Sequence, residues 1–262
     1  MNILKSELLK LVYSRRTWWI VIASIGIAVI SAAFTPYALS QLKSQIVMPL
    51  TNAQAVDGVY AKALGGYIFV IVIGVLMMTS EFHNHTAIAT FLATPKRAHA
   101  LWAKLVMAVI AGAVINLIAT IAGMIAAAVA LSFYPEAVAP SADIFINYPA
   151  ASLLIGAVLA IIGVGVGALI RNQTVAISTA LIWIFVVDRI LGVLFVSIGK
   201  YLPTGLITSM MDIKLSVTTT SKVASLNTAD YLDPLPAAGL LLVYGLVFAF
   251  AAMFTTLRRD ID

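Results

Sequence analysis

Six long apolar stretches, separated by more polar segments, dominate the chain. They cover Thr17–Tyr37, Ala63–Thr79, Leu105–Phe133, Pro149–Ile170, Thr174–Ile198 and Leu235–Leu257. An α-helix rises about 1.5 Å per residue, so about 20 apolar residues cross a hydrocarbon core of about 30 Å. The pattern therefore predicts an all-α polytopic membrane protein with six transmembrane helices.

The composition also indicates a lipid environment. Hydrophobic residues make up 62% of the 262 residues, charged residues make up 10%, and the mean hydropathy is +1.04. A soluble domain carries about 25% charged residues. The six spans and their connections occupy the whole length, so we expect one transmembrane domain over residues 1–262 and no separate soluble catalytic domain.

The first sixteen residues have a helical pattern of their own. Apolar residues recur there at helical spacing, at Ile3, Leu4, Leu8, Leu11 and Val12. Such a pattern is typical of a helix that lies in the plane of the membrane interface. We therefore expect residues 1–16 to form an interfacial helix and not a cleavable signal peptide; a simple positively charged anchor for topology is the alternative.

The lysine and arginine residues are unevenly distributed between the two sides of the membrane that the six predicted spans would cross. If the N-terminus is cytoplasmic, ten lie inside, at Lys5, Lys10, Arg15, Arg16, Lys96, Arg97, Lys104, Arg171, Arg258 and Arg259. Five lie outside, at Lys43, Lys62, Lys200, Lys214 and Lys222. Positive residues favour the cytoplasmic side. We expect a multi-pass protein of the cell membrane (inner or plasma membrane) with both termini cytoplasmic.

The net charge of +5 comes from residues beside the spans. Such residues attract anionic headgroups, so membrane lipids are expected partners and nucleic acid is not.

The segments that connect the spans differ in polarity and length. Ser40–Lys62 and Tyr134–Tyr148 are polar enough to be outer loops. Residues 199–234 form a long outer segment that is too polar to span but contains apolar Leu206 and Ile207, so a re-entrant or interfacial segment is expected before the sixth span.

Small residues within the spans predict close helix packing. The third span contains Gly112 and Gly123, and the fourth contains Gly156, Gly163, Gly165 and Gly167. Small residues let two backbones approach each other in lipid. Gly156 and Gly163 lie two turns apart on one face, which predicts a packing function for that face of the fourth span; the alternative is that glycine is merely frequent in membrane helices.

Catalytic and nucleotide-binding motifs are missing from the sequence. It has no G-x-x-x-x-G-K-[ST] phosphate loop, no H-E-x-x-H and no G-x-S-x-G. It has no cysteine, which excludes disulfides, thiolate catalysis and cysteine-bound zinc. Glu81, His83 and His85 are spaced by two, so a helix would point neighbours to different faces, and we predict a solvated loop there and no metal site. We do not expect this chain to be an enzyme.

Two charged residues fall within the fifth span. Asp188 and Arg189 lie about 14–15 residues after Thr174, past the midplane of the bilayer. Charges in a membrane usually face a cavity or a partner. One interpretation is a polar lining or gate of a translocation path. The other is a contact that holds the bundle together, with Arg189 free to extend toward the headgroups.

Residues 80–104 contain an ordered set of residues: Ser80, Glu81, Phe82, Thr86, Thr90, Leu92, Pro95, Arg97 and Lys104. In this order and spacing they resemble the permease subunits of ABC transporters of the type-2 (ABC-2) exporter family. Three further segments are similar to that family: Glu7–Trp18, Leu169–Thr174 and Tyr201–Pro203. The resemblance extends over the whole six-span layout and rests on the ordered set of segments.

The resemblance implies a coupling function for residues 81–104. In such permeases a cytoplasmic coupling helix after the second span docks in a groove of a separate ATP-binding subunit, and a smaller coupler follows the fourth span. The matching residues are Glu81, Phe82, Thr86, Ile88, Phe91, Leu92, Pro95, Arg97, Arg171 and Asn172. Apolar side chains in an otherwise polar loop also suit a partner surface. The alternatives are an amphipathic helix on the bilayer for 81–104 and a plain turn for 171–174.

The resemblance also implies partners and a substrate path. The permease would dimerise, with a second copy or a related permease, and pair with two copies of an ATP-binding subunit. That subunit would bind ATP and magnesium, so this chain needs no cofactor. The first, second and fifth spans would line the path between protomers. The candidate path or gate residues are Asp188, Arg189, Trp183, Phe69 and Met77, with Met78, Phe185 and Phe195 as further contacts; for the apolar ones, an ordinary lipid-facing or packing side chain is the alternative.

The expected function is therefore a transmembrane permease subunit of an ABC exporter. An apolar path with few charges favours an amphipathic or hydrophobic substrate, such as a peptide antibiotic, drug or lipid. An ATP-independent channel or carrier is the main alternative, although such proteins usually show midplane charges, broken helices or repeats. A non-transporting structural or sensor subunit also stays open.

Overall fold

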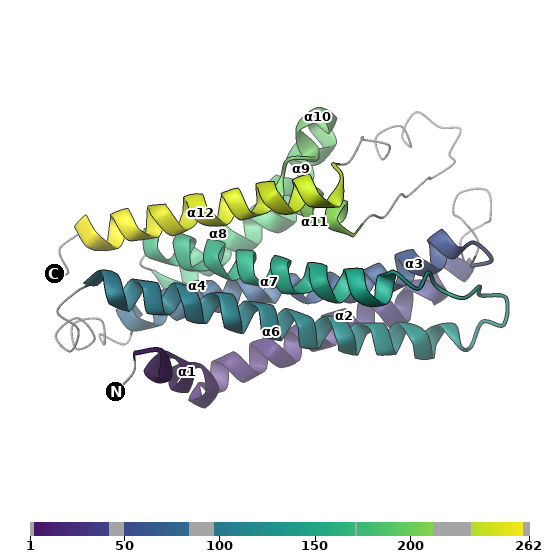
Figure 1. The fold of residues 1–262 in the computed structure, drawn as a ribbon, viewed down its shortest axis with the longest axis horizontal. Coiled ribbons are helices and arrows are strands. Elements are labelled where there is room, and N and C mark those ends of the chain that lie inside the picture. Colours follow the sequence, from purple (N-terminus) through teal and green to yellow (C-terminus); the bar gives the residue numbers. More distant parts are fainter. Residues whose placement is uncertain (1–2, 42–49, 84–96, 171, 212–231, 259–262) are drawn as a thin grey trace.

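The protein is built from helices arranged around one long central helix. The computed structural model describes residues 3–41, 50–83, 97–170, 172–211 and 232–258, and all regular elements in these ranges are helical (Figure 1). Six of the described segments are long and apolar enough to cross a membrane: Arg15–Gln41, Ala53–Ser80, Leu101–Leu131, Ile144–Leu169, Gln173–Gly192 and Pro234–Phe254. The prediction of an all-α, multi-pass membrane protein is confirmed.

The long helices run back and forth, so that both chain ends lie at the same end of the bundle (Figure 1). We call this the α1 end, after helix α1 (Ile3–Tyr13), and the other the α3 end, after helix α3 (Ala53–Ala61). Helix α2 (Arg15–Gln41) leads away from the α1 end, and α4 (Tyr67–His83) returns to it. In the same way, α6 (Arg97–Leu131) leads away from the α1 end and α7 (Ile144–Leu169) returns to it. Helix α12 (Pro234–Arg258) also ends at the α1 end.

The predicted N-terminal helix is present. Helix α1 ends at Tyr13, and only Ser14 separates it from α2. The Ser14 carbonyl accepts hydrogen bonds from the Thr17 and Trp18 amides, and the Trp18 indole donates to the Val12 carbonyl at 2.8 Å. The chain therefore changes direction within one residue. The first membrane helix begins at Arg15, two residues before the apolar stretch starts.

The segment Ser40–Lys62, predicted to be a loop, contains helix α3. The Asn52 side chain caps this helix by accepting a hydrogen bond from the Gln54 amide at 2.9 Å. Val56, Val59 and Tyr60 are buried on its inner face. The polar residues on the outer face obscured this pattern. A 3₁₀ turn, η1 (Lys62–Gly66), joins α3 to α4, so the second membrane segment is longer than the sequence indicated.

Helix α7 is the centre of the bundle and packs against α4, α6 and α12. It begins at Ile144, so Pro149, predicted to start the fourth span, lies inside the helix. A Cβ atom at Gly156 would overlap the carbonyl oxygen of Gly112 in α6. A Cβ atom at Gly163 would overlap the carbonyl oxygen of Ile71 in α4. The packing function predicted for the fourth-span glycines is confirmed. However, Gly156 packs against α6, whereas Gly163, on the same face of α7, packs against α4.

The fifth span is not one uniform helix. Helix α8 (Gln173–Ile182) continues through a π-helical turn, η2 (Trp183–Val187), into α9 (Asp188–Leu194). Phe195 then leaves the helical region, with φ −124° and ψ 76°, and ends α9 before the short α10 (Val196–Gly199). The predicted continuous helix over Thr174–Ile198 is therefore interrupted near its end.

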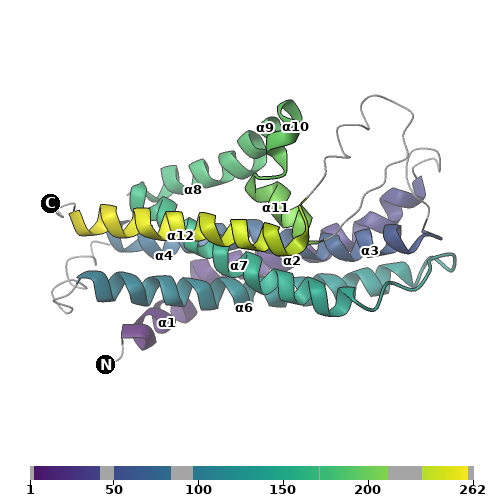
Figure 2. The same ribbon diagram turned by 45° about the horizontal axis from the view of Figure 1, so that its top comes forward.

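Helix α11 (Pro203–Met210) folds back from α10 toward the bundle (Figure 2). It packs against α9 and α12, and Leu206 and Ile207 are almost fully buried. The Tyr244 hydroxyl of α12 donates to the Tyr201 carbonyl at 3.2 Å. Part of the outer segment 199–234 is thus an ordered helix that returns to the core; its depth relative to a bilayer stays a prediction.

Candidate functional site

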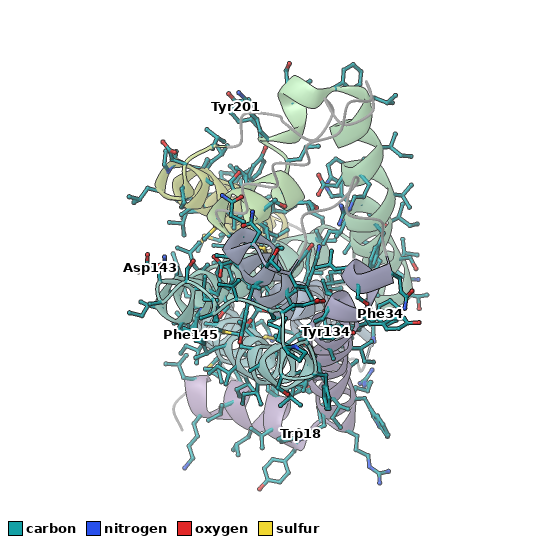
Figure 3. All side chains as sticks on the ribbon, turned by 90° about the vertical axis from the view of Figure 1, so that its right-hand side faces the viewer. Trp18, Phe34, Tyr134, Asp143, Phe145 and Tyr201 are labelled. Carbon is teal, nitrogen blue, oxygen red and sulfur yellow. The ribbon has the colours of Figure 1, made fainter. Side chains whose placement is uncertain are left out.

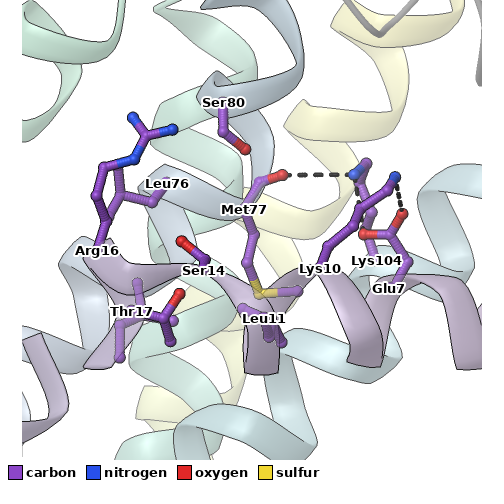
Figure 4. Close-up of a pocket in the computed structure, with 11 residues that line it drawn as sticks. Glu7, Lys10, Leu11, Ser14, Arg16, Thr17, Leu76, Met77, Ser80 and Lys104 are labelled. Carbon is purple, nitrogen blue, oxygen red and sulfur yellow. Dashed lines mark hydrogen bonds and ion pairs between the residues drawn. The ribbon is translucent and has the colours of Figure 1, made fainter. Parts of the chain in front are cut away.

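A polar cluster lies at the α1 end, where α1, α2, α4 and α6 meet (Figure 4). The Glu7 carboxylate pairs with Lys10 on its own helix, with 2.6 Å between Nζ and Oε1. Its other oxygen pairs with Lys104 of α6, with 3.1 Å between Nζ and Oε2. Lys104 also donates to the Met77 carbonyl in α4 at 3.4 Å. The Glu7 carboxylate therefore joins α1 to α6, and Lys104 joins α6 to α4.

Both partners of the Glu7–Lys104 pair are buried, each with a side chain only 5% exposed. Burial by itself would raise the pKa of the Glu7 carboxyl, but the charge of Lys104 and the hydrogen bonds from Lys10 and Lys104 lower this pKa below its ordinary value of 4.5. Glu7 is therefore ionised at neutral pH. Removing one member of a buried pair leaves an uncompensated charge, which is strongly destabilising.

The cluster surrounds a small cavity of about 60 Å³. Leu11, Ile73 and Leu76 form part of its apolar wall, and Arg16 lies at its side toward α8 (Figure 4). The Arg16 guanidinium donates to the Gln173 side chain at 3.5 Å, which connects the start of α2 to the start of α8. The α1 end is thus a junction at which polar side chains connect α1, α2, α4, α6 and α8.

Most of the sequence-predicted coupling residues lie outside the described part of the chain. The described ranges do not include Thr86, Ile88, Phe91, Leu92, Pro95 and Arg171. Glu81 and Phe82 belong to the last turn of α4, and Arg97 is the first residue of α6; the structure describes the backbone of these three but not their side chains. The ends of the segment 81–104 are therefore continuous with two membrane helices.

Asn172 is the one coupling candidate whose side chain is described. Its Oδ1 accepts hydrogen bonds from the Thr174 and Val175 amides, at 3.1 and 3.2 Å. These bonds cap the N-terminus of α8, whose first amides have no partner within the helix. Asn172 therefore has a local structural function, whatever it contacts in addition.

Asp188 lies at the π-helical turn of the fifth segment and faces α11. It is 2% exposed, and its Oδ2 accepts hydrogen bonds from the amide of Thr204, at 2.9 Å, and from the Thr204 hydroxyl. Its Oδ1 has no hydrogen-bond partner in the described part of the chain. Of the two interpretations of this carboxylate, the contacts favour the one in which it holds the bundle together.

The five candidate path residues lie on α4 and on the η2–α9 segment, and they differ in exposure. Arg189 is exposed and forms no ion pair with a described residue, and Trp183 is 47% exposed on the same segment. Phe69 is half-buried, and Met77 is buried at the α1 end beside Lys104. Sequence reasoning did not name Glu7 or Thr204 as site residues. Glu7 entered it only as the first residue of the segment Glu7–Trp18, which resembles the permease family.

No family model matches the chain, and no curated protein matches it significantly. The function must therefore be argued from the residues and from their arrangement in the bundle.

Proposed function

We propose that the chain is the transmembrane permease subunit of an ABC exporter, working as a dimer with two copies of a separate ATP-binding subunit. One observation carries the proposal. The two connections that resemble coupling segments, after α4 and between α7 and α8, both start at the α1 end, where helix α1 also lies. A soluble subunit docked at that end would reach both of them at once.

The polar junction at the α1 end supplies a mechanical path. ATP binding, with magnesium, would close the partner subunits and move the segment 81–104. That segment continues into α4 and α6, which hold α1 through Met77, Lys104 and Glu7. Arg16 carries the same movement to α8 through Gln173. Rearranged helices at the permease dimer interface would then expose the substrate path to the other side.

The charge distribution supports a cytoplasmic α1 end in the cell membrane. Described basic residues at this end are Lys5, Lys10, Arg15, Arg16, Arg97, Lys104 and Arg258, and those of the predicted outer set are Lys62 and Lys200. Positive charge favours the cytoplasmic side, so both chain ends would be cytoplasmic and the α3 end would face outward.

The substrate would travel between the two protomers along apolar helix faces. Helix α2 exposes Ile22, Ile30 and Phe34, and the α8–α9 segment exposes Trp183 and Phe185. In a membrane these faces meet either lipid or a second permease. Since they carry few charges, an amphipathic or hydrophobic substrate, such as a peptide antibiotic, drug or lipid, fits them best.

Co-purification of an ATPase tests the proposal. The tagged chain is extracted from its native membrane in mild detergent and compared with the Phe91→Asp, Leu92→Asp double variant. We expect a soluble ATPase to accompany the wild type and to be lost from the variant. A matched control is Phe133→Asp with Val138→Asp, which places the same charges on exposed positions at the α3 end and should retain the ATPase.

The opposite result favours the alternative function. The interrupted fifth segment at Phe195 is a feature that ATP-independent carriers also have. If crosslinked, gently extracted wild type carries no ATPase, the exporter proposal is wrong and a carrier or channel takes its place. If both double variants capture the ATPase equally, the proposed ATP-binding partner is correct, but the assignment of Phe91 and Leu92 to its docking segment is wrong.

A further inference from the structure

A cavity of about 630 Å³ opens at the α3 end between α3, α7, α11 and α12. Its volume is within the range of about 300–1,000 Å³ that small-molecule sites usually have. It is far larger than the cavity beside Glu7 and lies at the other end of the bundle. No pattern in the sequence indicates this cavity, because its walls come from four separate segments.

The polar wall of this cavity is acidic. Asp57 of α3 and Asp143, which precedes α7, both line it, and none of the lining residues that the structure describes is a lysine or an arginine. The Asp57 carboxylate accepts hydrogen bonds from the Ser141 amide and hydroxyl at 2.9 and 2.6 Å, which fix its position. Neither carboxylate forms an ion pair with a described residue. Two negative charges therefore line the cavity without a counter-charge among the described residues.

The other wall is apolar and comes from α7, α11 and α12. It includes Leu154, Met211 and Ala238. Methionine side chains are flexible and polarisable, so they adapt to apolar groups of different shape. Asn147 and Tyr148 of α7 also line the cavity. Seen from the α3 end, Asp143 lies at the periphery of the bundle (Figure 3).

We propose that this cavity binds an amphipathic organic cation. Its positively charged nitrogen or phosphorus centre would lie at Asp57 and Asp143, and its apolar body would lie against Leu154, Met211 and Ala238. A bare divalent metal ion fits less well, because in the described part of the chain no third carboxylate or histidine joins these two. The inference goes beyond the proposed function and does not depend on it, since the site needs neither an ATPase nor a second protomer.

Binding of tetraphenylphosphonium by the full chain tests the inference. The chain is reconstituted into nanodiscs of neutral phosphatidylcholine, and radiolabelled cation is measured by equilibrium dialysis against empty nanodiscs. Tetraphenylborate has the same shape and the opposite charge, so it reports partition into lipid without charge recognition. We expect saturable binding of the cation above the empty-disc level and no saturable binding of the anion.

Two variants locate the binding. Asp143→Asn should weaken cation binding by roughly fivefold, the order expected of one partly exposed charge pair. Ala150→Trp starts from an exposed alanine that lines the cavity, so it should fill the space and abolish saturable binding. The matched controls are Glu136→Gln and Ala142→Trp, exposed residues at the same end that do not line the cavity. Both should bind like the wild type.

The inference is overturned by any of three results: no cation above the empty-disc level, equal saturable binding of both ions, or wild-type binding by both cavity variants. Because the nanodiscs contain no ATPase, failure here leaves the exporter proposal standing. Loss of ATPase capture would likewise leave this cavity site intact.

Discussion

Glu7 and Lys104 lie 97 positions apart in the sequence and form a buried ion pair, with 3.1 Å between carboxylate and ammonium. The pair attaches the N-terminal helix α1 to the start of α6. Helix α1 exposes Leu4, Leu8 and Val12 on its other side. It can therefore rest on the membrane surface with its apolar side while one buried charge holds it to the bundle.

Lys104→Met should destabilise the protein by about 3 kcal/mol, because it leaves the buried Glu7 carboxylate with only the partly exposed Lys10 as described counter-charge. The double variant Glu7→Gln, Lys104→Met should lose less, since both charges are then removed. Thermal unfolding in detergent measures the effect. Lys5→Met, on the exposed side of α1, is the control and should melt like the wild type. Equal melting of Lys104→Met and Lys5→Met would contradict a stabilising pair.

The same carboxylate predicts a dependence of stability on acid. The pKa of Glu7 is lowered in the folded protein, so its ionised form is favoured by folding. Its contribution is complete above the ordinary pKa of 4.5 and is lost as the pH falls through the lower, folded value. Below pH 4.5, the wild type should lose melting temperature more steeply than Glu7→Gln. Parallel curves for the two proteins from pH 7 to pH 3 would show that Glu7 is not the group responsible.

Gly156→Ala should weaken the contact between α6 and α7. Its Cβ would overlap the Gly112 carbonyl oxygen, and backbone atoms cannot move aside as a flexible side chain can. Overpacking of this kind costs about 1–3 kcal/mol. Gly26→Ala is the matched control, because a Cβ at Gly26 meets nothing within 4 Å. We expect a lower melting temperature for the first variant and an unchanged or slightly higher one for the second.

Thr204→Val should loosen α11 from α9. It removes the hydroxyl that donates to Asp188 and leaves the buried carboxylate with the Thr204 amide as its described donor, at a cost of about 1–3 kcal/mol. Since the chain has no cysteine, Ser209→Cys provides a unique probe at a position that is 3% exposed. Maleimide labelling of this probe should be slow in the parent and in Thr204→Ser, and faster in Thr204→Val. Slow labelling in all three would mean that the Asp188 contact does not hold α11.

Single cysteines also test the proposed orientation. Tyr13→Cys places a thiol on the 81% exposed last residue of α1, and Glu136→Cys places one on an exposed residue at the α3 end. In intact cells an impermeant maleimide should label Glu136→Cys but not Tyr13→Cys. After permeabilisation both should react. The reverse pattern in intact cells would place the α1 end outside the cell. A cytoplasmic ATP-binding subunit could then not dock at that end, and the proposed function would be contradicted.

The positions of the membrane helices could be predicted from sequence because each helix satisfies its own backbone hydrogen bonds and needs only a continuous apolar run. The same reasoning missed α3, where the polar outer face hides the buried Val56 and Val59. It also missed the end of α9 at Phe195, because nothing in the apolar run from Thr174 marks a break there.

Sequence alone therefore determined the lipid environment, the six membrane segments, the N-terminal helix and the small residues that let α7 pack closely. Only the tertiary structure decided which polar groups meet. Glu7 pairs with Lys104, the Thr204 amide donates a hydrogen bond to Asp188, and Asp57 and Asp143 line one cavity. These contacts depend on where the helices pack against one another. Local periodicity carries no information about that packing, since it depends on contacts between residues far apart in the chain.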